Sequence, residues 1–132
     1  MVLLDSNVIL DLWDRDPNWS AWSSSQLRAL SPEHELVINV VVYAEISARF
    51  STRAKVDEKL EDLSIRVDDI PRDSAFLACK AFIDYRSQGG QRTKILPDFF
   101  IGAHAAVLAC PLLTRGTRRY ATYFPFVSLI AP

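Results

Sequence analysis

The chain has 132 residues, a net charge of −1 and 49% hydrophobic residues, a size typical of one domain that buries its core without disulfides or structural metals. No basic segment precedes an apolar stretch at the start, and the longest apolar stretch, 103–113, is too short to span a bilayer. These features argue against a secreted or membrane protein and predict one cytoplasmic domain over residues 1–132. Cys79 and Cys110 fit no metal or redox spacing, so we expect both to be reduced and buried.

Short apolar runs alternate with segments of helical periodicity, which is typical of βαβ units and a mostly parallel sheet. Strands are expected at residues 2–4, 36–40, 65–67, 112–114 and, at the sheet edge, 126–130. Helices are expected at residues 6–13, 17–30, 42–50, 53–63, 71–86 and 97–109. Asp16 and Pro17 predict the start of the second helix, as its N-cap and first helical residue. The expected fold class is α/β, a three-layer α/β/α domain with a four- to five-stranded sheet.

Three acidic residues stand near the ends of the expected strands. Asp5 comes directly after the first strand, Glu45 follows the second by about one helical turn, and Asp98 begins the helix before the fourth. Because sites in parallel α/β sheets form at the carboxyl ends of the strands, the three carboxylates can share one crevice. Clustered carboxylates repel one another unless a cation neutralises them. A hard divalent ion, Mg²⁺ or Mn²⁺, suits such a cluster.

Each acid also has an explanation that needs no site. Asp5 suits the N-cap of the helix that follows it, and Asp98 complements the dipole at its helix N-terminus. Glu45 is spaced for a salt bridge with Arg49, four residues further on. The apolar neighbours of Glu45 favour a position away from water instead. Taken together, the three strand-end positions favour a shared site.

Charge is unevenly distributed along the chain. Residues 1–78 carry 8 basic and 14 acidic side chains, whereas residues 79–132 carry 7 basic and 2 acidic ones. No acid follows Asp98, but Arg115, Arg118 and Arg119 do. A basic C-terminal part predicts a local surface that attracts phosphates. Any single arginine is equally well explained as an ordinary solvated charge.

Four ordered motifs resemble the PIN-domain family. They are residues 4–8 (LDSNV), 43–46 (YAEI), 96–103 (LPDFFIGA) and 113–120 (LTRGTRRY). The chain length and the closing stretch 120–132 look most like the VapC-type toxins of type II toxin–antitoxin pairs. The resemblance implies a parallel sheet flanked by helices and metal-dependent endonucleolytic cleavage of RNA, blocked by a cognate antitoxin. One motif alone would carry little weight, whereas four in matching order are specific.

Carried over by position, Asp5, Glu45 and Asp98 match three of the four acids with which the family holds its metal, Mg²⁺ or Mn²⁺. They are therefore the expected catalytic and metal-binding residues. Asn7 and Thr114 match polar residues that support those acids. The chemistry that the resemblance implies is displacement at phosphorus by a metal-activated water.

The same resemblance implies partners. The substrate would be RNA, with Arg115 and Arg118 as candidate RNA-binding residues. The chain would pair as a homodimer and bind a cognate antitoxin protein. Aromatic residues are enriched at interfaces, so we expect Trp19, Trp22 and Tyr43 to contribute docking surface.

One position departs from the family pattern. The fourth acid normally follows the Thr-Arg pair, where this chain has Gly116. The alternative function is therefore a PIN-like binding module with weakened or no catalysis. A phosphatase-like enzyme is a more distant alternative, because no nucleophile motif accompanies the acids. His34 and His104 are isolated in sequence, which argues against a zinc site.

Overall fold

The computed structural model describes residues 1–132 and contains one sheet of five parallel strands in the order β3-β2-β1-β4-β5. The strands are β1 (Val2–Leu4), β2 (Leu36–Asn39), β3 (Ile65–Asp68), β4 (Leu112–Leu113) and β5 (Leu129–Ile130). The helices are α1 (Ser6–Trp13), α2 (Ser20–Leu30), α3 (Val40–Ser47), α4 (Arg53–Asp62), α5 (Arg72–Ser87), α6 (Pro97–Leu108) and α7 (Arg118–Tyr123). The predicted α/β fold is confirmed.

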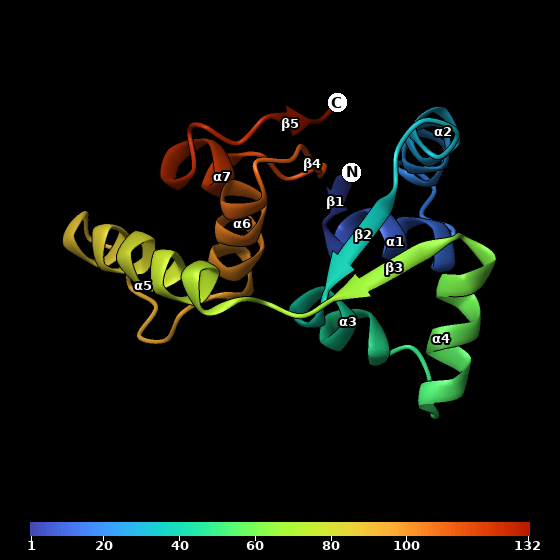
Figure 1. Ribbon diagram of the computed structural model, residues 1–132, viewed down its shortest axis with the longest axis horizontal. Coiled ribbons are helices and arrows are strands. Elements are labelled where there is room, and N and C mark those ends of the chain that lie inside the picture. The colour runs from blue at the N-terminus through green and yellow to red at the C-terminus, as the bar shows by residue number, and fades with distance from the viewer.

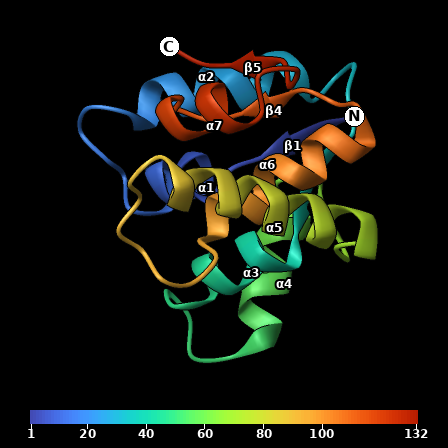
Figure 2. The same cartoon turned by 90° about the vertical axis from the view of Figure 1, so that its left-hand side faces the viewer.

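Helices cover both faces of the sheet. Helices α5, α6 and α7 lie on one side of the sheet, and α2 and α4 lie on the other (Figure 1). After a quarter turn, α7 lies with β4 and β5 at the top, and α3 lies lower down (Figure 2). The order of the strands puts β1 in the centre, and all three of its residues are fully buried. A central parallel strand covered on both faces reads as a continuous apolar run, as Val2–Leu4 does.

The pairing of β1 with β4 brings distant segments together at the site. Leu4 lies opposite Leu113, and the backbone N–H of Asp5 donates to the carbonyl of Leu113 at 2.9 Å. The carboxyl ends of the two strands therefore stay in register. As a result, Asp5 and Thr114 leave the sheet side by side.

The second helix begins later than its sequence predicts. Asp16 does act as a cap, since its side chain accepts from the backbone N–H groups of Asn18 at 2.8 Å and Trp19 at 2.9 Å. These bonds close a turn over residues 17–19, and α2 itself starts at Ser20. The capping chemistry was recognised in the sequence, but the helix start that was derived from it was wrong.

Asn39 turns the end of β2 into a helix, although three valines follow it. Its side-chain oxygen accepts from the backbone N–H groups of Val41 at 3.1 Å and Val42 at 3.0 Å. Val40, predicted as strand, is therefore the first residue of α3. The Asn39 amide also contacts Nδ1 of His104 at 3.3 Å. Burial lowers the pKa of His104, which favours a neutral ring whose Nδ1 accepts from this amide.

Two further features differ from expectation. Helix α7 was not predicted, because six residues show too little periodicity, and β5 is confined to Leu129–Ile130. Cys110 is buried but Cys79 is only half-buried, and neither forms a disulfide.

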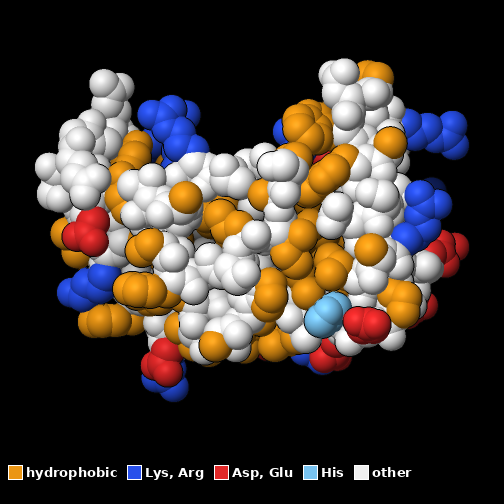
Figure 3. Space-filling model, turned by 90° about the horizontal axis from the view of Figure 1, so that it is seen from above, with side chains coloured by type: hydrophobic (Ala, Val, Ile, Leu, Met, Phe, Trp, Pro, Cys, Tyr) orange, Lys and Arg blue, Asp and Glu red, His pale blue; other side chains and the backbone are white.

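None of the helices has the length and apolar character needed to cross a membrane. Seen from above, hydrophobic and uncharged side chains occupy the middle of the face and charged ones lie mainly at its margin (Figure 3).

Asn39→Ala should lower the free energy of unfolding by about 2 kcal/mol, because it removes a cap and leaves buried backbone donors unsatisfied. Thr52→Ala is the matched control, since Thr52 caps α4 through one exposed bond of 3.4 Å. That change should cost about 1 kcal/mol or less. Urea unfolding of both variants measures the difference, and equal losses would show that the buried cap of α3 has no special weight.

Candidate active site at the carboxyl ends of the strands

The carboxylate of Asp5 is buried at the end of β1, where the residue is 5% exposed. Its Oδ2 atom accepts three hydrogen bonds, from Thr114 Oγ1 at 2.8 Å, Tyr120 OH at 3.0 Å and Asn7 Nδ2 at 3.1 Å. Its Oδ1 atom has a single long contact, from Ser6 Oγ at 3.4 Å. Although Asp5 occupies the N-cap position of α1, its side chain makes no capping bond. The geometry therefore rejects a simple cap and leaves Oδ1 with free acceptor capacity.

The electrostatics of Asp5 are those of a charge held away from water. Burial raises the pKa of Asp5, the hydrogen bonds from Thr114 and Tyr120 partly offset that rise, and the charge of Asp98 adds to it. Burial and then the charge of Asp5 raise the pKa of Tyr120 far above its ordinary value. Tyr120 therefore keeps its proton and donates a hydrogen bond to the carboxylate.

Glu45 and Asp98 share the electrostatic field of Asp5. Partial burial raises the pKa of Glu45 first, and the charges of Asp5 and Asp98 raise it further. The residue as a whole is exposed, so the expected position away from water is wrong. Its carboxyl group nevertheless senses the charges of the other two acids. The salt bridge that its spacing allowed does not form, because Arg49 pairs with Asp14 at 2.8 Å. No ion pair neutralises Glu45.

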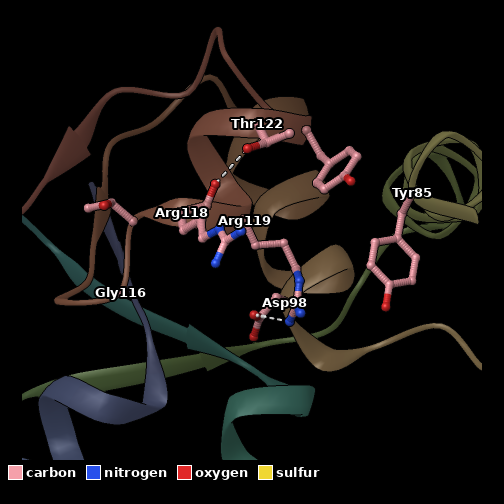
Figure 4. Close-up of a pocket in the computed structure, with 8 residues that line it drawn as sticks. Tyr85, Asp98, Gly116, Arg118, Arg119 and Thr122 are labelled. Carbon is pink, nitrogen blue, oxygen red and sulfur yellow. Dashed lines mark hydrogen bonds and ion pairs between the residues drawn. The ribbon is translucent and has the colours of Figure 1, made fainter. Parts of the chain in front are cut away.

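Asp98 stands in the first turn of α6 beside a pocket of about 670 Å³. The pocket is lined by Tyr85, Asp98, Gly116, Thr117, Arg118, Arg119, Thr122 and Tyr123. Arg119 extends across it and donates from Nη1 to Oδ2 of Asp98 at 2.9 Å (Figure 4). The two side chains are each 36% exposed, so the ion pair is partly open to water.

Gly116 lies on the loop between β4 and α7, on the far side of the same pocket from Tyr85 (Figure 4). A Cβ atom at this position would meet only Nδ2 of Asn7, at 3.7 Å, which is an ordinary contact. Its backbone conformation is not one that requires glycine. The site therefore has room for the carboxylate that this chain lacks.

Arg115 is occupied inside the protein. Its Nε atom donates to the buried Asp11 at 3.0 Å, and its guanidinium lies 5.6 Å from the ring centre of Trp19. Ser23 Oγ also donates to Asp11, at 2.9 Å. The Arg115 backbone N–H donates to Asn7 Oδ1 at 3.3 Å. Arg115 thus clamps the loop after β4 onto α1, and this geometry does not leave its charge for RNA.

Several residues that build the site were not assigned a role from the sequence. Tyr120 and Arg119 contact Asp5 and Asp98 only because α7 folds back over the end of β1. A short helix gives little sequence signal, so neither role was visible in the pattern. Arg118 is exposed, and its side chain makes no hydrogen bond or ion pair. Of Arg115, Arg118 and Arg119, it is the one that forms no ion pair.

The donor set suits a hard cation in its chemistry. Asp5, Glu45 and Asp98 offer only oxygen atoms, which magnesium and manganese prefer and zinc does not require. Burial is the main cause that raises the pKa values of Asp5 and Glu45, and the charges of neighbouring acids add to it. As the side chains stand, however, no three His, Cys, Asp or Glu residues lie close enough to hold one ion. Asp98 is turned toward Arg119 instead.

In metal-free protein, Asp5→Asn should gain stability relative to the parent as the pH rises. The folded-state pKa of Asp5 lies above the ordinary value of an aspartate, 3.8, which applies to the unfolded chain. The parent therefore loses stability as the pH rises from the unfolded pKa through the folded pKa, whereas asparagine does not titrate. Urea unfolding in a chelator at about pH 4 and about pH 7 compares the two.

Asp14→Asn is the control of opposite sign. The hydrogen bond from Arg49 lowers the pKa of Asp14, so the stability that Asp14 contributes is present at neutral pH and is lost as the pH falls. This variant should be less stable than the parent at about pH 7. A difference between Asp5→Asn and the parent that stays constant with pH would contradict the electrostatic account of Asp5.

Comparison with known proteins gives a consistent family and fold. The sequence matches the PIN domain family over residues 2–125, and no curated protein sequence matches it significantly. The structure resembles a chain of VapBC2 from Rickettsia felis bound to a promoter DNA fragment, with a TM-score of 0.75, 16% identity and coverage of 100% of this chain and 99% of that one.

Two further structures are similar over nearly their whole length. A chain of VapBC-1 from nontypeable Haemophilus influenzae has a TM-score of 0.71 and 22% identity, with 99% of this chain and 98% of that one covered. A chain of a toxin–antitoxin complex from Klebsiella pneumoniae has a TM-score of 0.71 and 21% identity, with 96% and 95% covered. At these identities the likeness shows the fold. Because the family match spans almost the whole chain, the protein belongs to the PIN domain family.

Proposed function

We propose that this protein is a metal-dependent endoribonuclease that acts as the toxin of a type II toxin–antitoxin pair. Asp5, Glu45 and Asp98 would hold Mg²⁺ or Mn²⁺ and carry the catalysis. The observation that supports this most is the buried Asp5 carboxylate, held by three donors with one oxygen left for a ligand. A structural carboxylate would be satisfied at both oxygen atoms or paired with a base. Membership of the PIN domain family adds support, because the acidic motifs of this chain resemble those of the family's nucleases.

The residues around Asp5 have supporting roles. Asn7, Thr114 and Tyr120 fix the orientation of the carboxylate, as outer-shell partners of metal ligands do. Glu45, which is exposed, and Asp98 beside the pocket add the remaining negative charge. A divalent ion bound there would polarise a phosphate group and activate a water molecule.

The pocket beside Asp98 offers a path for the RNA strand. Arg118 lines it with a free charge, and arginine pairs well with phosphate oxygens. Tyr85 and Tyr123 line it as well, and aromatic side chains stack on unpaired bases. Because Arg115 is held by Asp11, we propose Arg118 rather than Arg115 as the residue that binds phosphate.

The neighbouring structures support an antitoxin partner. They are described as VapBC and toxin–antitoxin complexes, and we extend that partnership to this chain together with a homodimer. Trp19, the N-cap of α2, and Trp22 on α2 pack edge to face, with ring centres 6.2 Å apart. Tyr43, which is on α3, lines a separate hollow together with Phe50. Because α2 and α3 lie far apart in both views (Figures 1 and 2), we propose two separate docking areas.

A binding module without catalysis is the second candidate. The observation that favours it is Gly116, which leaves the site one acid short, together with the pairing of Asp98 to Arg119. Such a protein would bind RNA or an antitoxin without cutting. Cleavage assays on position 116 separate the two functions.

Gly116→Asp should raise RNA cleavage by at least about tenfold, the scale on which even outer-shell changes alter metal sites. It adds one hard oxygen ligand and one negative charge, and the structure has room for the side chain. The parent should cut weakly at millimolar Mg²⁺ and better in Mn²⁺. Cleavage of a labelled single-stranded RNA in each metal measures both effects.

Gly116→Asn is the matched control, because asparagine has the same shape without the charge. It should gain little. Asp98→Asn placed in the Gly116→Asp background should abolish the gained cleavage while leaving the circular dichroism spectrum unchanged. If Gly116→Asp cut no better than the parent or the Asn variant, position 116 would lie outside the metal site and the binding-module function would be favoured.

The proposed partners predict the state of the protein in solution. Sedimentation at micromolar concentration should give a dimer, and a small protein encoded beside the chain in its operon should co-purify with it. Protein in a chelator should behave in the same way, because the proposed dimer and antitoxin complex need no metal. A strict monomer with no co-purifying protein would contradict the toxin–antitoxin part of the function and leave the nuclease part to the cleavage assays.

A further inference from the structure

Arg119 is placed to act on the acids from within the chain. It belongs to α7, and the next residue, Tyr120, donates to Asp5. The bond that fixes Tyr120 therefore also fixes the point from which Arg119 starts. From there its guanidinium reaches Asp98 at 2.9 Å, across the pocket that Gly116 leaves open (Figure 4).

The aromatic wall of the pocket holds this guanidinium in place. Its central carbon lies 5.9 Å from the ring centre of Tyr85 and 5.9 Å from that of Phe99. An arginine over aromatic faces loses little on leaving water, because its planar group is weakly hydrated and attracted to the rings. The position beside Asp98 is therefore suited to hold a positively charged group.

Arg119 neutralises only one of the three acids. Glu45 has no ion pair, and Asp5 accepts bonds from neutral donors alone. Neither Glu45 nor Asp5 therefore has a basic side chain that offsets its charge. A divalent ion would satisfy all three acids, but it needs the Asp98 oxygen that Arg119 holds.

We propose that Arg119 is an internal counter-ion of Asp98 that competes with the divalent cation for this carboxylate. The inference rests on the proposed metal site and adds a regulation of it. In the metal-free protein Arg119 offsets the charge of Asp98, and the ion must displace it to complete its ligand set. The absence of a side chain at position 116 sharpens this competition, because no other acid offers the ion or the arginine an alternative partner.

Mn²⁺ binding measured by isothermal titration, without RNA, tests the competition. Arg119→Gln should bind Mn²⁺ several-fold more tightly than the parent, because Asp98 is then free. Arg118→Gln is the matched control, since it removes the same charge from the same pocket but no ion pair. It should change the affinity much less. In an Asp98→Asn background, Arg119→Gln should no longer improve binding, which separates competition for Asp98 from a general charge effect.

Arg119→Lys covers the case in which the glutamine variant folds poorly, because it keeps the charge without the planar fork, and its affinity should lie between those of the parent and Arg119→Gln. Equal affinity in the parent, Arg119→Gln and Arg119→Lys would overturn the counter-ion role while the metal site stands. Equal gains in Arg118→Gln and Arg119→Gln would also overturn it, as a general charge effect. If none of the proteins bound Mn²⁺, the proposed metal site would fail and the counter-ion role with it.

Discussion

Burial of the Asp5 carboxylate is the constraint on which the rest of the structure depends. An ionised group taken out of water is costly unless hydrogen bonds compensate it. Here the compensation comes from three separate parts of the chain, through Asn7 on α1, Thr114 after β4 and Tyr120 on α7. The same bonds that make the charge tolerable therefore fasten the C-terminal segment to the central strand. Site and fold share these contacts.

The uneven charge along the sequence is balanced in part inside the molecule. Arginines of the basic C-terminal part pair with acids elsewhere, as Arg115 does with Asp11 and Arg119 with Asp98. Of Arg115, Arg118 and Arg119, only Arg118 forms no ion pair. A charge asymmetry in sequence predicts an attractive surface only when the charges are not already paired. In this fold two basic side chains of the C-terminal part form ion pairs, and Arg118 stays exposed.

The proposed function depends on the acids whose charge no cation offsets. Glu45 has no cation beside it, and one oxygen of Asp5 has only a long contact. Membership of the PIN domain family gives this excess of negative charge a chemical meaning. The glycine at position 116 and the arginine at position 119 act in the same direction, since one withholds a ligand and the other occupies one. Both bear on how strongly the proposed site would hold an ion, and neither disturbs the strands that position the acids.

The sequence by itself determined the elements whose pattern is local. Apolar runs and helical periodicity gave a parallel α/β sheet, and the rule that sites form at strand ends selected Asp5 and Asp98 with Glu45. Only the tertiary structure decided which groups meet those acids. Tyr120 lies 115 residues from Asp5, and Arg119 lies 21 residues from Asp98. Periodicity within a short window carries no information on such pairings, because they depend on how strands β1 and β4 and helix α7 come together in space.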